Sequence, residues 1–198
     1  MKVLVACEFS GIVRDAFIRK GHDAMSCDLL PSESDFGPHY QGDVFDIIGD
    51  GWDMMIAHPP CTYLCNSGVC WLHKQEGRWK KMGQGASFFN YLLNAPIDKI
   101  AVENPIPHKY AVEIIGRKYD QVIQPWMFGH PESKATCLWL KGLPKMVETN
   151  NVRAEFKALP KKVAQRMHWA SPGPDRWRIR STTFLGIAKA MADQWGDL

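Results

Sequence analysis

Two apolar runs, each followed at once by residues that can carry chemistry, constrain this chain more than any other feature. The run Met54–Ala57 leads through His58 into Pro59-Pro60-Cys61. The run Ile100–Val102 leads into Glu103-Asn104. Short apolar runs bounded by turn residues are typical of buried strands in a parallel sheet. Because parallel strands end at a common edge, the sequence predicts a thiol and a carboxyl group side by side at that edge.

The remaining patterns alternate between strand and helix. Strands are predicted at residues 3–6, 22–28, 52–57, 97–102, 119–125 and 135–140, and helices at 12–19, 83–93 and 183–195. This alternation predicts an α/β fold with a doubly wound, mostly parallel sheet, and the last two strands are expected to form an antiparallel edge pair. The short segment 43–48 is a further element of unspecified type.

Length and composition indicate one domain. With 198 residues and 45% hydrophobic content, the chain can form one compact core but not two full domains, so residues 1–198 are interpreted as a single catalytic domain. No apolar run approaches the roughly 20 residues that span a bilayer, and Met1–Cys7 resembles a strand rather than a signal peptide. The six cysteines are scattered, which favours reduced thiols. We therefore expect a cytoplasmic protein, assumed monomeric and without a membrane partner.

Positive charge is concentrated near the end of the chain. Arg153–Arg180 holds eight Lys or Arg and two acidic residues, a local net charge of +6 within a total of +3. Residues 143–180 are thus predicted to form a basic, irregular segment. This pattern suits either a surface that contacts a polyanion or a solvated helix face. The candidate nucleic-acid-binding residues are Arg78, Lys80, Lys81, Arg166, Arg176, Arg178 and Arg180, with Trp169 and Trp177 placed for base stacking.

Cys61 and Glu103 have opposite chemical requirements. The thiolate is the reactive form of cysteine, so the site must lower the pKa of the Cys61 thiol or remove its proton during attack. A carboxyl group that gives a proton to a ring nitrogen at neutral pH must be kept partly protonated, and burial is expected to raise the pKa of Glu103 for this purpose. The pair is therefore predicted to act as nucleophile and acid.

The turn after the first strand is the expected cofactor site. Glu8, Phe9, Ser10 and Gly11 form this turn, and Asp28 and Asp43 follow the next two elements. Carboxylates at such positions commonly accept hydrogen bonds from ribose hydroxyls or an adenine amino group. With one glycine, the turn does not match the dinucleotide fingerprint, and a plain tight turn remains an alternative interpretation.

These motifs, in this order, resemble the cytosine-5 DNA methyltransferase family and are most similar to the short forms carried by phages and prophages. The resemblance is carried by Phe9-Ser10-Gly11, Asp28, Gly42-Asp43, Pro59-Pro60-Cys61, Glu103-Asn104 and a final glycine-containing helix, and it covers roughly residues 3–143 and 181–195. It implies a Rossmann-like methyltransferase fold that uses S-adenosylmethionine, with DNA as the partner. Cys61 would add to C6 of cytosine, Glu103 would interact with N3, and C5 would take the methyl group. Phe9, Asp28, Asp43 and Pro59 would line the cofactor site.

The chain departs from the family pattern in several places. Ile12-Val13-Arg14 stand where the family has further glycines, His58 replaces a usual glycine, and Thr62 replaces a usual glutamine. The supporting Gln-x-Arg element is most nearly matched by Glu132-Ser133-Lys134, which assigns Lys134 to the catalytic group beside Cys61, Glu103 and Asn104. Only about 37 residues could replace the family's large target-recognition domain. A methyltransferase acting on RNA or a nucleotide, or an inactive protein that binds nucleic acid or cofactor, therefore remain alternatives.

One rival pattern involves metal. His58, Cys61, Cys65, Cys70 and His73 are residues of the types that bind zinc. Their spacing is not that of a familiar zinc finger, and the Pro-Pro-Cys motif already accounts for Cys61. We therefore predict no metal.

Overall fold

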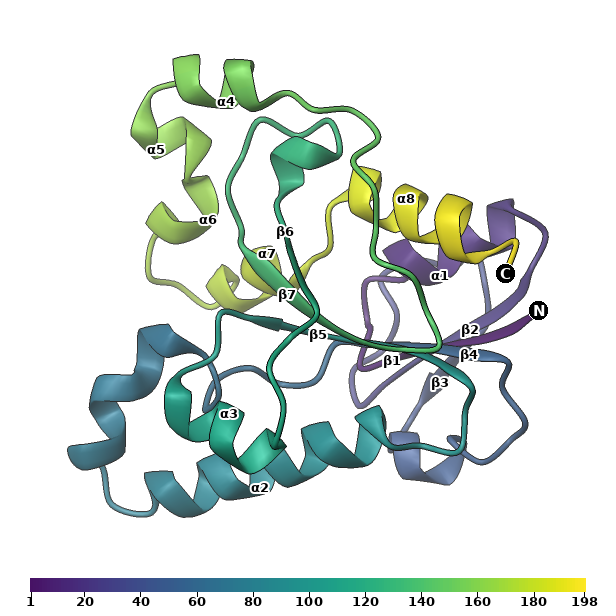
Figure 1. Ribbon diagram of the computed structural model, residues 1–198, viewed down its shortest axis with the longest axis horizontal. Helices are drawn as coiled ribbons and strands as arrows, with labels where there is room; N and C mark the ends of the chain where they lie inside the picture. The colour runs from purple at the N-terminus through teal and green to yellow at the C-terminus, as the bar shows by residue number, and fades with distance from the viewer.

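The computed structural model describes all residues from Met1 to Leu198, and its centre is a seven-stranded sheet. The strand order is β3-β2-β1-β4-β5-β7-β6 (Figure 1). The first five strands pair in parallel, and β7 runs antiparallel to both β5 and β6. The bounds are β1 (Lys2–Ala6), β2 (Asp23–Asp28), β3 (His39–Gln41), β4 (Met54–Ala57), β5 (Lys99–Pro105), β6 (Gln121–Ile123) and β7 (Thr136–Lys141).

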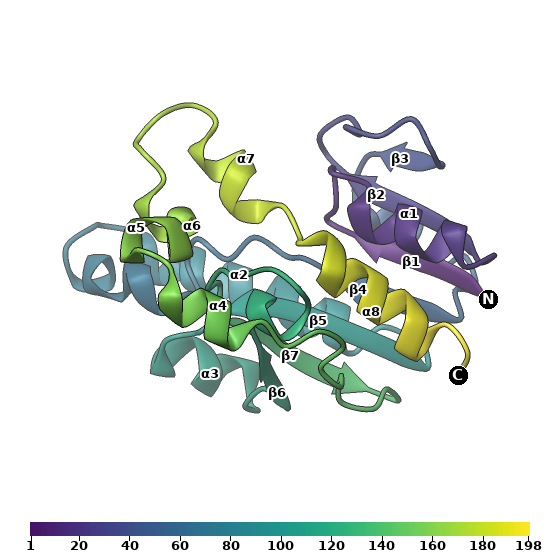
Figure 2. The same cartoon turned by 90° about the horizontal axis from the view of Figure 1, so that it is seen from above.

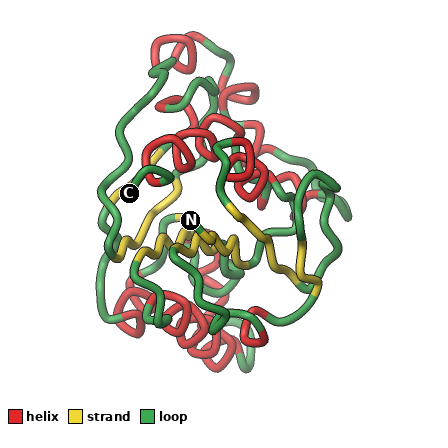
Figure 3. Tube along the Cα trace, turned by 90° about the vertical axis from the view of Figure 1, so that its right-hand side faces the viewer, coloured by secondary structure: helices red, strands yellow, loops and turns green.

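Helices cover both faces of this sheet. In Figures 1 and 2, α1 and α8 lie side by side on one face, and α2 and α3 lie on the other. Figure 3 shows the strands as a layer between the helices. The bounds are α1 (Ile12–Arg19), α2 (Arg78–Leu93), α3 (Lys109–Ile115), α4 (Arg153–Ala158), α5 (Lys161–Ala164), α6 (Arg166–Trp169), α7 (Arg176–Ser181) and α8 (Leu185–Trp195), with 3-10 turns η1 (Val44–Asp46), η2 (Asn66–His73) and η3 (Pro125–Met127). None of the helices combines the length and apolarity needed to cross a membrane.

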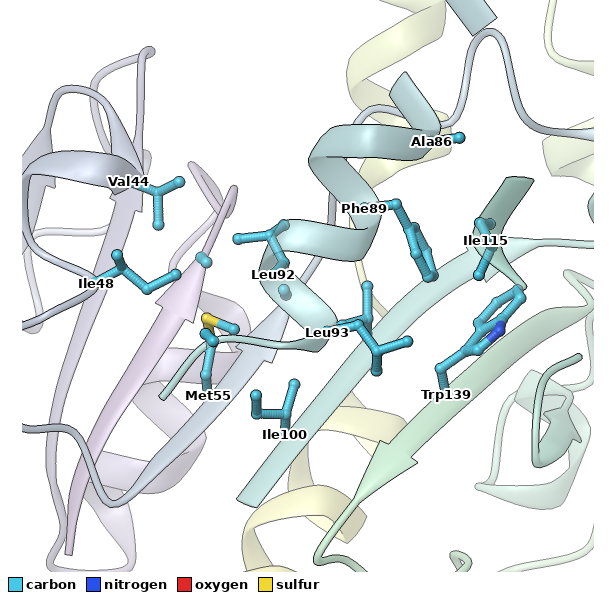
Figure 4. Close-up of a cluster of buried hydrophobic side chains, with 14 of the residues drawn as sticks. Val44, Ile48, Met55, Ala86, Phe89, Leu92, Leu93, Ile100, Ile115 and Trp139 are labelled. Atoms are coloured by element: carbon cyan, nitrogen blue, oxygen red, sulfur yellow. The ribbon is translucent and has the colours of Figure 1, made fainter. Parts of the chain in front are cut away.

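Alternation along the strands creates two cores. Leu4 and Ala6 of β1 belong to the core beneath α2 and α3, whereas Val3 and Val5 belong to the core beneath α1 and α8. This is the period-2 pattern of a sheet that is buried on both faces. Figure 4 shows Phe89 of α2 beside Trp139 of β7, and their ring centroids are 4.8 Å apart. Burial on both faces explains why the strands have continuous apolar sequences.

The predicted fold class is confirmed. The sheet is doubly wound and mostly parallel, the β6–β7 pair is antiparallel, and the arrangement is Rossmann-like. The predicted helix at 12–19 has the observed bounds of α1, and the predicted helix at 183–195 corresponds to α8. Residues 43–48, left unassigned in type, contain the 3-10 turn η1.

Several local predictions were incomplete or wrong. β3 and α3 were missed, because each is short and lacks a long apolar period. Helix α2 begins at Arg78, five residues before the predicted start at 83, because its first turn is mostly polar and carries no apolar period. β5 continues through Glu103-Asn104, which pair with β7, so these residues lie within a strand rather than after it. The segment 143–180, predicted to be irregular, contains the short helices α4 to α7.

Candidate active site

Cys61 lies in a tight turn directly after β4. The backbone amides of Leu64 and Cys65 both donate to the Cys61 carbonyl at 3.0 Å, so one helical turn separates the two cysteines. Pro59 is buried and Pro60 is exposed in the approach to this turn. Because prolines have no amide donor and a fixed φ, they direct the chain out of the sheet at this point. The local sequence therefore presents the thiol at the carboxyl edge of β4.

Three hydrogen bonds join this turn to the segment after β5. Asn66 N donates to Ile106 O at 2.8 Å, and His108 N donates to Leu64 O at 3.0 Å. The His108 imidazole also lies 3.0 Å from Tyr63 O through Nε2. These contacts fix the position of Cys61 relative to Glu103. Sequence reasoning missed His108, which is the N-cap of α3 and whose side chain accepts from Ala111 N. Histidine is not among the residues preferred at this position, so no local pattern marks it.

Glu103, His58 and Lys134 form a polar cluster beside Cys61. The His58 Nδ1 and Glu103 Oε1 atoms are 3.5 Å apart, and both side chains are largely buried. Lys134 Nζ donates to Thr182 O at 3.0 Å, just before α8. All three cluster residues line a cavity of about 10 Å³ that Phe184 closes from the α8 side. The structure therefore brings the proposed Lys134 to Glu103, and it adds His58, which the sequence interpretation treated only as a departure.

Neighbouring cations determine the ionisation of Glu103. Burial raises the pKa of this carboxyl group, but the hydrogen-bonding and charge interactions with His58 and the charge of Lys134 lower it, and the net direction is downward. The expectation that burial keeps Glu103 partly protonated is therefore wrong. Burial lowers the pKa of Lys134, with Glu103 and Cys61 opposing that shift.

The two cysteines of the turn act as a coupled pair. Hydrogen bonding from Cys61 is the main reason why the pKa of Cys65 is lowered to about 5, with further support from Ser67 and the Gly68 amide. The pKa of Cys61 is raised by the same pairing, by burial and by the charge of Glu103. Of the two routes open to the nucleophile, this geometry favours removal of the Cys61 proton during attack.

Asn104 is oriented away from Glu103. Consecutive residues of a strand point to opposite faces, so Glu103 faces α8 and Asn104 faces the α2 side. Asn104 is 1% exposed, and its Oδ1 has no hydrogen-bond partner. A buried acceptor without a donor costs free energy, which makes this atom available to a ligand or to bound water.

The turn after β1 is satisfied internally. The Glu8 carboxylate accepts from Val13 N at 2.7 Å and from Arg14 N at 3.1 Å, and Ser10 Oγ donates to it at 3.2 Å. Gly11 has φ +73°, and a Cβ there would lie 2.5 Å from Arg14 Nη2. Gly11 is therefore required by its backbone conformation and by the packing of Arg14. The first amides of α1, which often bind an anionic group, already hold the Glu8 carboxylate.

The other proposed cofactor residues lie around this turn at the carboxyl edge. Asp28 accepts from Leu30 N and Asp43 from Phe45 N, each at 3.0 Å and each through Oδ1 only. The second oxygen of each carboxylate could accept from a ribose hydroxyl or an adenine amino group, so these residues fit the nucleoside part of S-adenosylmethionine. Phe9 is buried and packs against Trp177 of α7, with ring centroids 5.4 Å apart. Segment α7 therefore covers the residue expected to contact adenosine.

The proposed nucleic-acid-binding residues differ in their surroundings. Arg166 is paired with Glu132 at 2.6 Å, and Arg178 is paired with Glu33. Arg176 Nε donates to Ala170 O at 2.8 Å. Arg180 lies close enough to Cys65 for its charge to help lower the pKa of that thiol. The charged segment is therefore partly neutralised within the protein, and Arg180 is the member nearest the thiols.

The three candidate nucleic-acid-binding residues that follow Cys61 in the sequence also differ in how far the protein itself holds them. Arg78 donates to Gln75 Oε1 at 2.9 Å and to Thr62 O at 3.3 Å, so it supports the Cys61 turn. Lys81 lies 5.9 Å from the centre of the Tyr63 ring, and Lys80 is exposed.

The structure does not gather the residues of the rival zinc pattern. It contains no group of three or more His, Cys, Asp or Glu placed to hold a metal ion. His58 faces Glu103, whereas His73 packs against Trp79 and Tyr110.

Comparisons with known proteins give structural likeness only. No protein-family profile matches the chain, and no curated protein sequence matches it. Among solved structures, a protein described as a DNA modification methyltransferase encoded within a prophage (E. coli) aligns with a TM-score of 0.48 and 17% identity, covering 81% of this chain and 56% of that one.

Two further structures give similar values. The Entamoeba histolytica methyltransferase EhMeth aligns with a TM-score of 0.46 and 15% identity over 76% of this chain and 57% of that one. The S. pombe Dnmt2 methyltransferase aligns with a TM-score of 0.46 and 14% identity over 100% of this chain and 66% of that one. The chain therefore spans 56% to 66% of the length of these three structures. At these values the likeness concerns the arrangement of strands and helices.

Proposed function

We propose that this protein transfers a methyl group from S-adenosylmethionine to C5 of cytosine in DNA through a covalent Cys61 adduct. The observation that carries the proposal is the fixed relation between the Cys61 turn and the end of β5. Hydrogen bonds from Asn66 N to Ile106 O and from His108 N to Leu64 O join the two segments. A nucleophile and a polar group for the ring nitrogen are thereby held together, as covalent attack on a pyrimidine requires.

Each residue of the group has a distinct role in this reaction. Cys61 Sγ bonds to C6, Glu103 interacts with N3, and Lys134 stabilises the negative charge around Glu103 and Cys61. Asp28 and Asp43 would hold the nucleoside part of S-adenosylmethionine, which supplies an electrophilic methyl group when bound. Glu8 at the first amides of α1 leaves less room for an anionic group there than an open glycine turn would.

A second candidate is methyl transfer to another pyrimidine substrate, such as RNA or a nucleotide. It is favoured by the internal pairing of Arg166 and Arg178, which reduces the charge available for a DNA duplex. Extracting a cytosine from a duplex costs a few kcal/mol, and nucleotides or single strands avoid most of that cost. A third candidate, a binding protein without catalysis, is favoured by the Glu8 contacts.

The test is incubation of the full chain with methyl-labelled S-adenosylmethionine and a panel of duplex DNA, single-stranded DNA, RNA and nucleotides. We expect label at cytosine in DNA. DNA containing 5-fluorocytosine should form a stable adduct with Cys61, because fluorine replaces the C5 hydrogen and cannot leave as a cation. Label only in RNA or nucleotides would support the second candidate. Cofactor binding without label in any substrate would support the third.

A further inference from the structure

His58 stands where the resembled family usually has glycine, and its imidazole is enclosed by the protein. The side chain is 10% exposed, and neither ring nitrogen has a hydrogen-bond partner that meets normal geometry. A buried imidazole without partners costs free energy, so its retention requires a physical reason. Its Nδ1 atom lies 3.5 Å from Glu103 Oε1, slightly beyond hydrogen-bond distance.

The surroundings of His58 favour its protonated form. Burial lowers the pKa of the imidazole, but the close interaction with the Glu103 carboxylate and the charge of Glu8 raise it. Lys134 opposes this shift, and the net direction is upward. The cavity residues from α8 and the turn before it, including Phe184 and Ile187, carry no charge. The carboxylates of β5 and of the turn after β1 therefore outweigh the single cation.

The charges of the resting site do not provide an obvious source for the proton that N3 needs. In the proposed reaction, N3 of the pyrimidine gains a proton as Cys61 attacks C6. Glu103 is held as a carboxylate by His58 and Lys134, so it has no proton of its own to give. The His58 imidazolium, whose Nδ1 lies 3.5 Å from Glu103 Oε1, is an acidic group in position to supply that proton.

We propose that His58 is a positioning residue that orients Glu103 and supplies the proton which Glu103 passes to N3. This inference rests on the proposed function. When the sulfur–C6 bond forms, the Cys61 S–H bond breaks and its proton passes to the Cys65 thiolate. The C5=C6 π electrons move to the C4–C5 bond, the C4=N3 π electrons form the N3–H bond, and His58 becomes neutral as its N–H bond breaks. When the C5 proton passes to solvent and the sulfur–C6 bond breaks, Cys61 regains its proton from Cys65, and the N3 proton returns through Glu103 to His58. The proton count is thereby restored at each turnover.

The first test compares pH–rate profiles of methyl transfer for the wild type and for His58→Gln. In the wild type the rate should fall as the pH rises through the raised pKa of His58, because neutral imidazole has no proton to give. In His58→Gln this alkaline limb should disappear, and the maximal rate should be lower by at least about tenfold. His22→Gln is the matched control, because His22 Nε2 is also buried without a partner but packs against Phe17, away from the site. A profile of His58→Gln that coincides with that of the wild type would overturn the proposal.

The second test does not depend on activity or on the folding of a His58 variant. NMR titration of the His58 ring in the full chain should give a midpoint above that of a free imidazole. In Glu103→Gln this midpoint should fall, because the main partner that favours the cation is removed. An unchanged midpoint would overturn the pairing. If the wild type methylates DNA but either test fails, only this inference is overturned. If the wild type transfers no methyl group, both the proposed function and the proton relay are overturned.

Discussion

The two halves of the carboxyl edge of the sheet differ in whether their buried polar groups are hydrogen-bonded. Around the turn after β1, the Glu8 carboxylate is hydrogen-bonded, and the Arg14 guanidinium bonds to Asp15, Ser26 and other neighbours. The whole chain has five buried side-chain polar atoms without a partner. Four of them lie around the Cys61 turn and belong to His58, Arg78 and Asn104.

This difference distinguishes the half of the edge that supports the fold from the half that is proposed to carry out the reaction. Buried polar groups are normally hydrogen-bonded, and an unpaired group is tolerated where a ligand or a reaction uses it. The half that contains Cys61 therefore has hydrogen-bonding capacity that the protein itself leaves unused. The half that contains Glu8 uses its capacity to hold α1 and the loop after β2 in place, so it is expected to contribute more to stability than to catalysis.

The largest expected effect on this comparison comes from Cys61→Ala. Methyl transfer should fall by at least about 10⁴-fold, because no other group can form the bond to C6. Cofactor binding, measured by calorimetry, should change little, since the cofactor residues belong to the other half. Cys70→Ala is the matched control, because Cys70 is an exposed free thiol in the same loop. Unchanged activity in Cys61→Ala would exclude this sulfur from the mechanism.

Arg14→Ala tests the supporting half. Arg14 is fully buried and paired with Asp15 at 2.8 Å, so its removal leaves a buried carboxylate without its main partner. The free energy of unfolding should fall by about 3–5 kcal/mol in urea titrations. Arg19→Ala, on the exposed side of the same helix, should cost less than about 1 kcal/mol. A loss for Arg14→Ala as small as that for Arg19→Ala would mean that the polar contacts of Arg14 do not stabilise this half.

The order of strands and helices could be predicted because both faces of the sheet are buried. Continuous apolar runs such as Met54–Ala57 reveal central strands, and the prolines after them mark the strand exit. The ionisation of Glu103 could not be predicted, because it depends on His58 and Lys134, which are 45 and 31 residues away in the sequence and meet only in the folded chain. The roles of Glu8 and Arg14 were hidden for the same reason. Local sequence identifies the strand end, but tertiary contacts determine the charge of its side chains.

Cys65→Ser tests how the catalytic half controls its nucleophile. In the wild type the pKa of Cys65 is lowered to about 5, so the pair carries a negative charge above that pH, and this charge and the hydrogen bond raise the pKa of Cys61. Serine keeps the size but carries no charge at neutral pH. The pH midpoint for alkylation of Cys61 by iodoacetamide, followed by mass spectrometry, should therefore move downward.

Cys70→Ser should leave that midpoint unchanged, because the exposed Cys70 thiol is not among the groups that shift the pKa of Cys61. A Cys61 midpoint in Cys65→Ser equal to that of the wild type would show that the two sulfurs do not share a proton.

The smallest expected effect concerns the basic segment, where neutralised and available charges can be compared directly. Arg180→Ala should reduce the magnitude of the slope of log K against log salt by about one, because a cation near the thiols that contacts a phosphate releases its counterion. Arg166→Ala removes a cation already paired with Glu132 and should change the slope less.

The double variant Arg176→Ala, Arg178→Ala should weaken DNA binding and flatten the slope, with the smaller share from Arg178 because Glu33 already neutralises it. Filter binding at a series of salt concentrations measures all three. Equal slopes in every variant would mean that this segment faces away from nucleic acid and serves to cover Phe9.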